Sequence, residues 1–195
     1  MSYKIYFSCA LGVALAMLSS DMGGAAEKRR HEAHAHGVAE VNIAIDGSKA
    51  DVEFRAPAES VMGFEHEAKS ESDKQKRDAA LQTVQTKINQ MVVFDPKLSC
   101  KFSEVKTAIV EEKGEPGKTQ PDKSAHEHKD QKRTAEHREV RATFSVACDK
   151  ALAGSRMTFG VHKTFPAIGE IKVQVLGDAK QSGATIKKDK GGVGF

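Results

Sequence analysis

The feature that most constrains the fold of this chain is a strict alternation of side chains at positions 139–148. The apolar positions are Val140, Ala142, Phe144, Val146 and Cys148, and the residues between them are Glu139, Arg141, Thr143, Ser145 and Ala147. Successive side chains of a strand point to opposite faces, so a period of two predicts a strand with one buried face. Cys148 falls on that buried face.

Similar patterns predict several other strands. Residues 38–56 are predicted to form a β-hairpin with Asp46-Gly47 as its turn, and Pro57 ends the second strand. Further strands are expected over 100–110, 157–161 and 171–175, with a short edge piece at 185–186. The glycine-rich end of the chain, 191–195, has no pattern that assigns it to an element.

One segment has the period of an amphipathic helix. Ser70 and Asp73 fit a capping box, and four apolar residues then follow at helical spacing: Leu81, Val84, Ile88 and Met91. These predict a helix over 71–92 that packs on the sheet, while 58–62 is expected to form a turn or one helical turn. The fold class is therefore α+β, with antiparallel sheet of about six or seven strands and one main helix in a single domain.

The start of the chain predicts export. A basic residue, Lys4, precedes an apolar run over 5–18 that is short for a bilayer span, and small residues lead up to Ala26. We predict a signal peptide over 1–26, cleaved after Ala26, and an exported domain over 27–195. The alternative is an uncleaved anchor or a buried N-terminal helix. No second long apolar run exists and Cys9 lies in no lipobox, so we expect no stable membrane anchor.

Removal of the signal peptide leaves two cysteines, Cys100 and Cys148. An even number in an exported chain indicates a disulfide, and the absence of Cys-x-x-Cys makes a metal site the weaker alternative. If the two cysteines face each other in an antiparallel pair, Val110 lies opposite Arg138. The disulfide then closes the base of a long hairpin whose tip is the charged segment 111–139, which is predicted to be disordered or loosely ordered.

Histidines are concentrated near the start of the predicted mature chain. If the first strand reaches back to His34, then His34 and His36 share its polar face, about 7 Å apart. Imidazole is a favoured ligand of zinc, copper and nickel, and a carboxylate can add an oxygen ligand. We therefore predict a metal site formed by His34, His36, His66 and Glu65, with His31 more loosely involved.

The predicted insertion holds a second group of candidate ligands: His126, His128 and His137. They would form a weaker capture site for metal. The alternative is a solvated loop in which the histidines are incidental.

Several functional classes are excluded by the sequence. The net charge is only +3 and the charges alternate in sign, which does not favour nucleic-acid binding. His-Glu-x-x-His and Gly-x-Ser-x-Gly are both missing, and segment 114–119 lacks the spacing of a phosphate-binding loop. No catalytic residue is assigned.

Taken together, these segments resemble the ZrgA-type zinc-regulated periplasmic proteins of Gram-negative bacteria. The resemblance rests on residues 34–39, on Pro57 with the Gly-Phe-Glu-His segment 63–66, on the helix after it, on the two cysteines with the insertion between them, and on Phe165-Pro166. It implies binding of Zn²⁺ in the periplasm and an accessory role in zinc uptake, beside a zinc ABC transporter and its solute-binding protein.

We therefore expect a non-enzymatic zinc chaperone or buffer. Two alternatives remain at this point. One is a metal-dependent envelope hydrolase, in which Glu65 would act as the base. The other is a structural or interaction module with incidental histidines.

Overall fold

A computed structural model of the chain describes residues 36–112, 137–177, 181–187 and 191–194, all within one compact unit. The strands in this part are β1 (Val38–Asp46), β2 (Lys49–Pro57), β3 (Val92–Phe94), β4 (Lys101–Glu112), β5 (His137–Ala147), β6 (Arg156–Phe159), β7 (Glu170–Leu176), β8 (Gln181–Ile186) and β9 (Gly192–Gly194). The helices are α1 (Ala58–Met62), α2 (Glu71–Met91) and α3 (Val161–Thr164), with a 3-10 turn, η1, at Pro96–Leu98. None of the helices in these ranges has the length and apolar character needed to cross a membrane.

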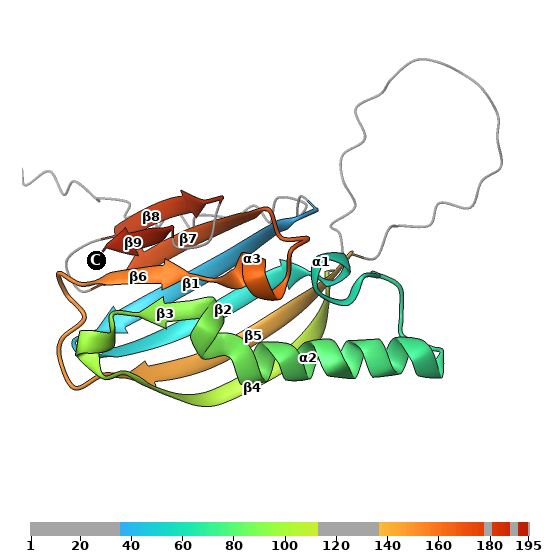
Figure 1. Ribbon diagram of the computed structural model, residues 1–195, viewed down its shortest axis with the longest axis horizontal. Coiled ribbons are helices and arrows are strands. Elements are labelled where there is room, and N and C mark those ends of the chain that lie inside the picture. Colours follow the sequence, from blue (N-terminus) through green and yellow to red (C-terminus); the bar gives the residue numbers. More distant parts are fainter. Residues whose placement is uncertain (1–35, 113–136, 178–180, 188–190, 195) are drawn as a thin grey trace, which may run out of the picture. The chain divides into compact units, whose positions relative to one another are not determined.

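The strands form two sheets. The large sheet has six strands in the order β4-β5-β2-β1-β7-β8, and the small sheet has the order β3-β6-β9 (Figure 1). β1 and β7 run parallel, whereas the other pairs in both sheets are antiparallel. The predicted α+β class with one main helix is confirmed, and the large sheet is mixed because of this one parallel pair.

One face of the large sheet packs against α2, α3 and the small sheet, which lie in front of it in Figure 1. The predicted stripe of α2 is confirmed: Val84, Ile88 and Met91 are buried and Leu81 packs at the margin of the core. The predicted cap is also present, since the backbone N–H of Asp73 donates to Ser70 Oγ at 3.1 Å. The helix therefore begins and packs as its sequence pattern indicates.

Two predicted strands have different ends in the structure. β1 begins at Val38 and does not reach back toward His34, because Gly37 adopts a φ of +79° and turns the chain. β6 ends at Phe159 and Gly160 is the N-cap of α3, so Val161, which was predicted to end the strand, lies on the helix instead. Gly160 lies so close to α2 that an added Cβ would be 2.6 Å from the carbonyl oxygen of Gln90.

The β4–β5 hairpin contains the predicted disulfide between Cys100 and Cys148. Its register differs from the prediction by one residue, so that Val110 lies opposite Glu139 instead of Arg138. A β-bulge between Ser103 and Lys106 causes the shift, because it adds one residue to β4, and Glu104 there has a φ of +55°. The two strands occupy 111–112 and 137–139, and residues 113–136 of the predicted insertion lie outside the described residues.

Candidate metal centre

Three candidate ligands lie at the ends of three neighbouring strands. His36 lies two residues before β1, Glu59 lies in α1 two residues after β2, and His137 is the first residue of β5. Because β1 and β5 both pair antiparallel with β2, these three ends lie at the same edge of the large sheet. Adjacent strands are about 4.8 Å apart, so the topology alone brings these side chains within reach of one another.

The turn that carries His36 is fixed by the backbone of Gly37. The Gly37 N–H donates to Ser60 Oγ of α1 at 3.2 Å, and its carbonyl accepts from the N–H groups of Gly169 and Glu170 at 2.8 and 3.1 Å. An added Cβ on Gly37 would lie 3.1 Å from the carbonyl oxygen of Ala167. The close approach and the positive φ both require glycine at this position.

A second segment, which follows α1, brings Glu65 to the same place. Gly63 ends α1 with a φ of +85°, and its N–H donates to the carbonyl of Glu59 at 2.8 Å. Phe64 packs against the core and anchors the segment. Glu65 is consequently held near the strand ends, with its side chain only 24% exposed.

These elements gather four side chains, His36, Glu59, Glu65 and His137, which we call the His36 cluster. His36 Nδ1 lies 2.8 Å from Glu59 Oε2 and 3.8 Å from Glu65 Oε1. The other Glu65 oxygen, Oε2, lies 3.6 Å from His137 Nδ1. The Glu65 carboxylate therefore stands between the two imidazoles.

The chemistry of the His36 cluster suits a divalent cation. One ligand atom from each of His36, Glu59 and Glu65 can be chosen so that all three lie within 4.8 Å of one another. Ligands of a tetrahedral zinc ion are roughly 3.3 Å apart, so small rotations of these side chains would bring the donor atoms to zinc-binding distances. The two carboxylates also bring negative charge to the cluster, which attracts cations.

His66, the neighbour of Glu65, lies elsewhere. Its Nε2 is 3.4 Å from Asp73 Oδ2 at the start of α2, and its ring lies 4.7 Å from that of Phe64. The pKa of the Asp73 carboxyl is lowered, first by the hydrogen bond from Ser70 and further by His66. The structure thus places Glu65, rather than His66, next to His36.

Four of the predicted ligands are not among the described residues, and one residue of the His36 cluster was not predicted. His31, His34, His126 and His128 lie outside the described residues. Glu59 was not predicted as a site residue, although the hairpin register offered a signal. A turn at Asp46-Gly47 brings the start of the first strand, next to His36, beside the end of the second strand, just before Glu59.

Comparisons with known proteins identify the family of the chain. A comparison with curated proteins found no match. A scan against protein-family models matches residues 33–195 to the model described as "ZrgA family zinc uptake protein". The match spans the whole described part of the chain and includes all four residues of the His36 cluster. The chain belongs to the ZrgA family of zinc uptake proteins.

Proposed function

We propose that this chain is a zinc-binding accessory protein of the periplasm, which holds zinc at the His36 cluster and supports zinc uptake as a chaperone or buffer. The observation that carries the proposal is the position of Glu65, whose two carboxylate oxygens face His36 and His137 respectively. With Glu59, these residues offer two nitrogen and two oxygen ligands. Four protein ligands of these types can complete a tetrahedral zinc shell.

The ligand types favour zinc over the common alkaline-earth ions. Imidazole nitrogen suits zinc, copper and nickel, whereas calcium and magnesium prefer oxygen ligands alone. Membership of a zinc uptake family supports zinc among the metals that imidazole can bind.

The exposure of the ligands supports a role in transfer rather than in permanent storage. The side chains of His36 and Glu59 are 64% and 55% exposed. A ligand from a partner protein can therefore approach the ion from solvent and replace these side chains one at a time. A structural zinc site, by contrast, is closed around its metal.

The sequence and the disulfide support a periplasmic location. The predicted signal peptide over 1–26 directs export, and a disulfide such as Cys100–Cys148 persists in oxidising compartments. The recipient we propose is the solute-binding protein of a zinc ABC transporter. Ligation by His31, His34, His126 and His128 stays a prediction beside the His36 cluster.

The proposal is tested by a zinc titration of the mature chain against a chromophoric chelator. We expect Glu65→Gln to weaken binding by about tenfold or more, because it removes the carboxylate charge between the two imidazoles. The matched control is Glu67→Gln, at an exposed glutamate that pairs with Lys69 at 3.2 Å, outside the His36 cluster. Equal affinity in the wild type and in Glu65→Gln would refute the site.

Zinc affinity is expected to fall as the pH is lowered, because protons compete with the metal for the imidazole nitrogens. A protonated imidazole cannot ligate a metal, so each histidine ligand that is protonated in the metal-free protein must release that proton when zinc binds. With two histidine ligands, the logarithm of the apparent affinity should approach a slope of two per pH unit on the acid side. Chelator titrations between pH 5 and pH 8 measure this slope, and a flat profile would show that histidines do not bind the zinc.

A further inference from the structure

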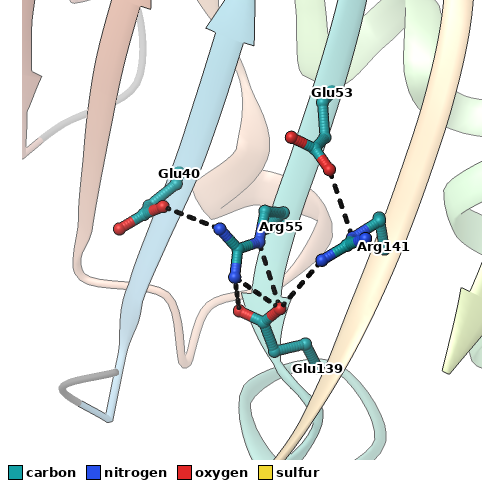
Figure 2. Close-up of polar contacts among 5 residues, drawn as sticks. All are labelled: Glu40, Glu53, Arg55, Glu139 and Arg141. Carbon is teal, nitrogen blue, oxygen red and sulfur yellow. Dashed lines mark hydrogen bonds and ion pairs between the residues drawn. The ribbon is translucent and has the colours of Figure 1, made fainter. Parts of the chain in front are cut away.

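Five charged side chains from β1, β2 and β5 form a polar network (Figure 2). They alternate with the core residues of these strands and therefore lie on the opposite face of the large sheet. The members of this network are Glu40, Glu53, Arg55, Glu139 and Arg141. The Arg55 guanidinium donates from Nε and Nη2 to the Glu139 carboxylate at 2.8 to 3.1 Å. Its third nitrogen, Nη1, lies 3.6 Å from Glu40 Oε2. Arg55 of β2 therefore connects both neighbouring strands.

The central pair of the network is buried. The side chains of Arg55 and Glu139 are 9% and 1% exposed. Burial opposes the charge of Arg55, but its hydrogen bonds to Glu139 and the nearby carboxylates outweigh burial, so the pKa of Arg55 is raised. Burying an ion pair often adds little net stability compared with apolar residues of the same size, and one attested role of such pairs is to fix geometry.

Each strand joined by Arg55 leads directly to a member of the His36 cluster. Glu40 is the third residue of β1 and lies four residues after His36, and Glu139 lies two residues after His137 on β5. Arg55 lies two residues before the end of β2, and the helix that carries Glu59 begins directly after that strand. Arg55 and its carboxylate partners therefore connect the three strands close to the ends at which the His36 cluster lies.

We infer that Arg55 and Glu139 are positioning residues of the zinc site: their bidentate pair, with Glu40, holds the ends of β1, β2 and β5 at the spacing that zinc coordination needs. This inference rests on the proposed function. Lysine cannot replace Arg55 in this role, because its single ammonium group cannot form the fork that engages Glu139 twice and still reaches Glu40.

The test is Arg55→Lys, with Arg141→Lys as its matched control. Arg141 is the partner of Arg55 in the β2–β5 register, and it contacts Glu53 at 3.2 Å and Glu139 at 3.8 Å without reaching β1. We expect Arg55→Lys to weaken zinc binding by about tenfold or more, as loss of an outer-shell partner does, and Arg141→Lys to leave it within about twofold. The visible absorption spectrum of bound Co²⁺, which reports coordination geometry, should change in Arg55→Lys alone.

If Arg55 only stabilised the fold, its replacement would lower stability without changing zinc affinity. The core variant Val175→Ala, on β7, lowers stability without touching the network, and its zinc affinity should match that of the wild type. If Arg55→Lys lowers the melting temperature but keeps the wild-type zinc affinity and cobalt spectrum, the inference is wrong.

Should Arg55→Lys fail to fold, Glu40→Gln removes only the link to β1, and it must weaken zinc binding several-fold for the inference to stand. Failure of Glu65→Gln to affect zinc binding would instead refute the proposed function itself.

Discussion

Replacing both His36 and His137 by alanine is expected to weaken zinc binding by more than roughly a hundredfold. The two imidazoles are the proposed nitrogen ligands of the His36 cluster, and they lie 3.8 and 3.6 Å from opposite oxygens of Glu65. Loss of an outer-shell partner alone lowers metal affinity by about 10–100-fold, so loss of two direct ligands should exceed that range. The same chelator competition that tests Glu65→Gln measures the effect.

The control for this prediction is His66→Ala. His66 is as exposed as His36, at 64%, but its partner is Asp73 and not the cluster. We expect zinc affinity within about twofold of the wild type. A larger loss in His66→Ala than in the His36/His137 variant would overturn the cluster and favour the ligand set predicted from sequence. Because these histidines are partly or largely exposed, their replacement should change the free energy of unfolding by only about 0.5 kcal/mol each.

Local patterns were sufficient to predict most of the fold. The β1–β2 hairpin follows from alternation around Asp46-Gly47, and α2 follows from a serine cap and a stripe that ends at Met91. In both cases the signal lies within one short segment, because the period of the apolar residues and the capping group are local properties.

Features that depend on contacts between distant segments were not predictable in this way. The parallel pairing of β1 with β7 joins residues near 40 to residues near 172, and no local pattern specifies it. β9 is a glycine-rich strand that exists because Val193 packs into the core and pairs opposite Met157. The bulge between Ser103 and Lys106 is likewise a property of the pairing of β4 with β5, and alternation within β4 alone does not indicate it.

For the candidate site too, the sequence predicted local features but not the contacts between distant segments. His36, Glu65 and His137 were singled out from the sequence, but they were assigned to two different groups of ligands. The structure brings the three together because β5 begins at His137, beside the end of β2. Glu59 joins them because α1 follows directly after β2, and Glu65 lies nearby because Gly63, in the αL conformation, ends α1. Residue type identified the chemistry, but only the strand order could show which ligands meet.

Removing the disulfide, by replacing Cys100 and Cys148 with alanine, is expected to lower the free energy of unfolding by about 4 kcal/mol. The two cysteines are 48 residues apart in sequence, and closing a loop of that length restricts the unfolded chain by about this amount in the chain-entropy model. For a domain of this size the melting temperature should fall by roughly 8–16 °C. Thermal unfolding of the metal-free protein measures the change, and reduction of the wild type should reproduce it.

Zinc affinity, in contrast, should stay within about twofold of the wild type at temperatures where the variant is folded. Cys148 follows the end of β5, whereas His137 begins that strand, so the disulfide and the His36 cluster lie at opposite ends of the β4–β5 hairpin. Arg55 and Glu139 already fix the strand ends near the cluster, and they do not require the distant disulfide to do so. A loss of affinity as large as that of Arg55→Lys would mean that the whole hairpin, rather than the buried ion pair, sets the ligand spacing.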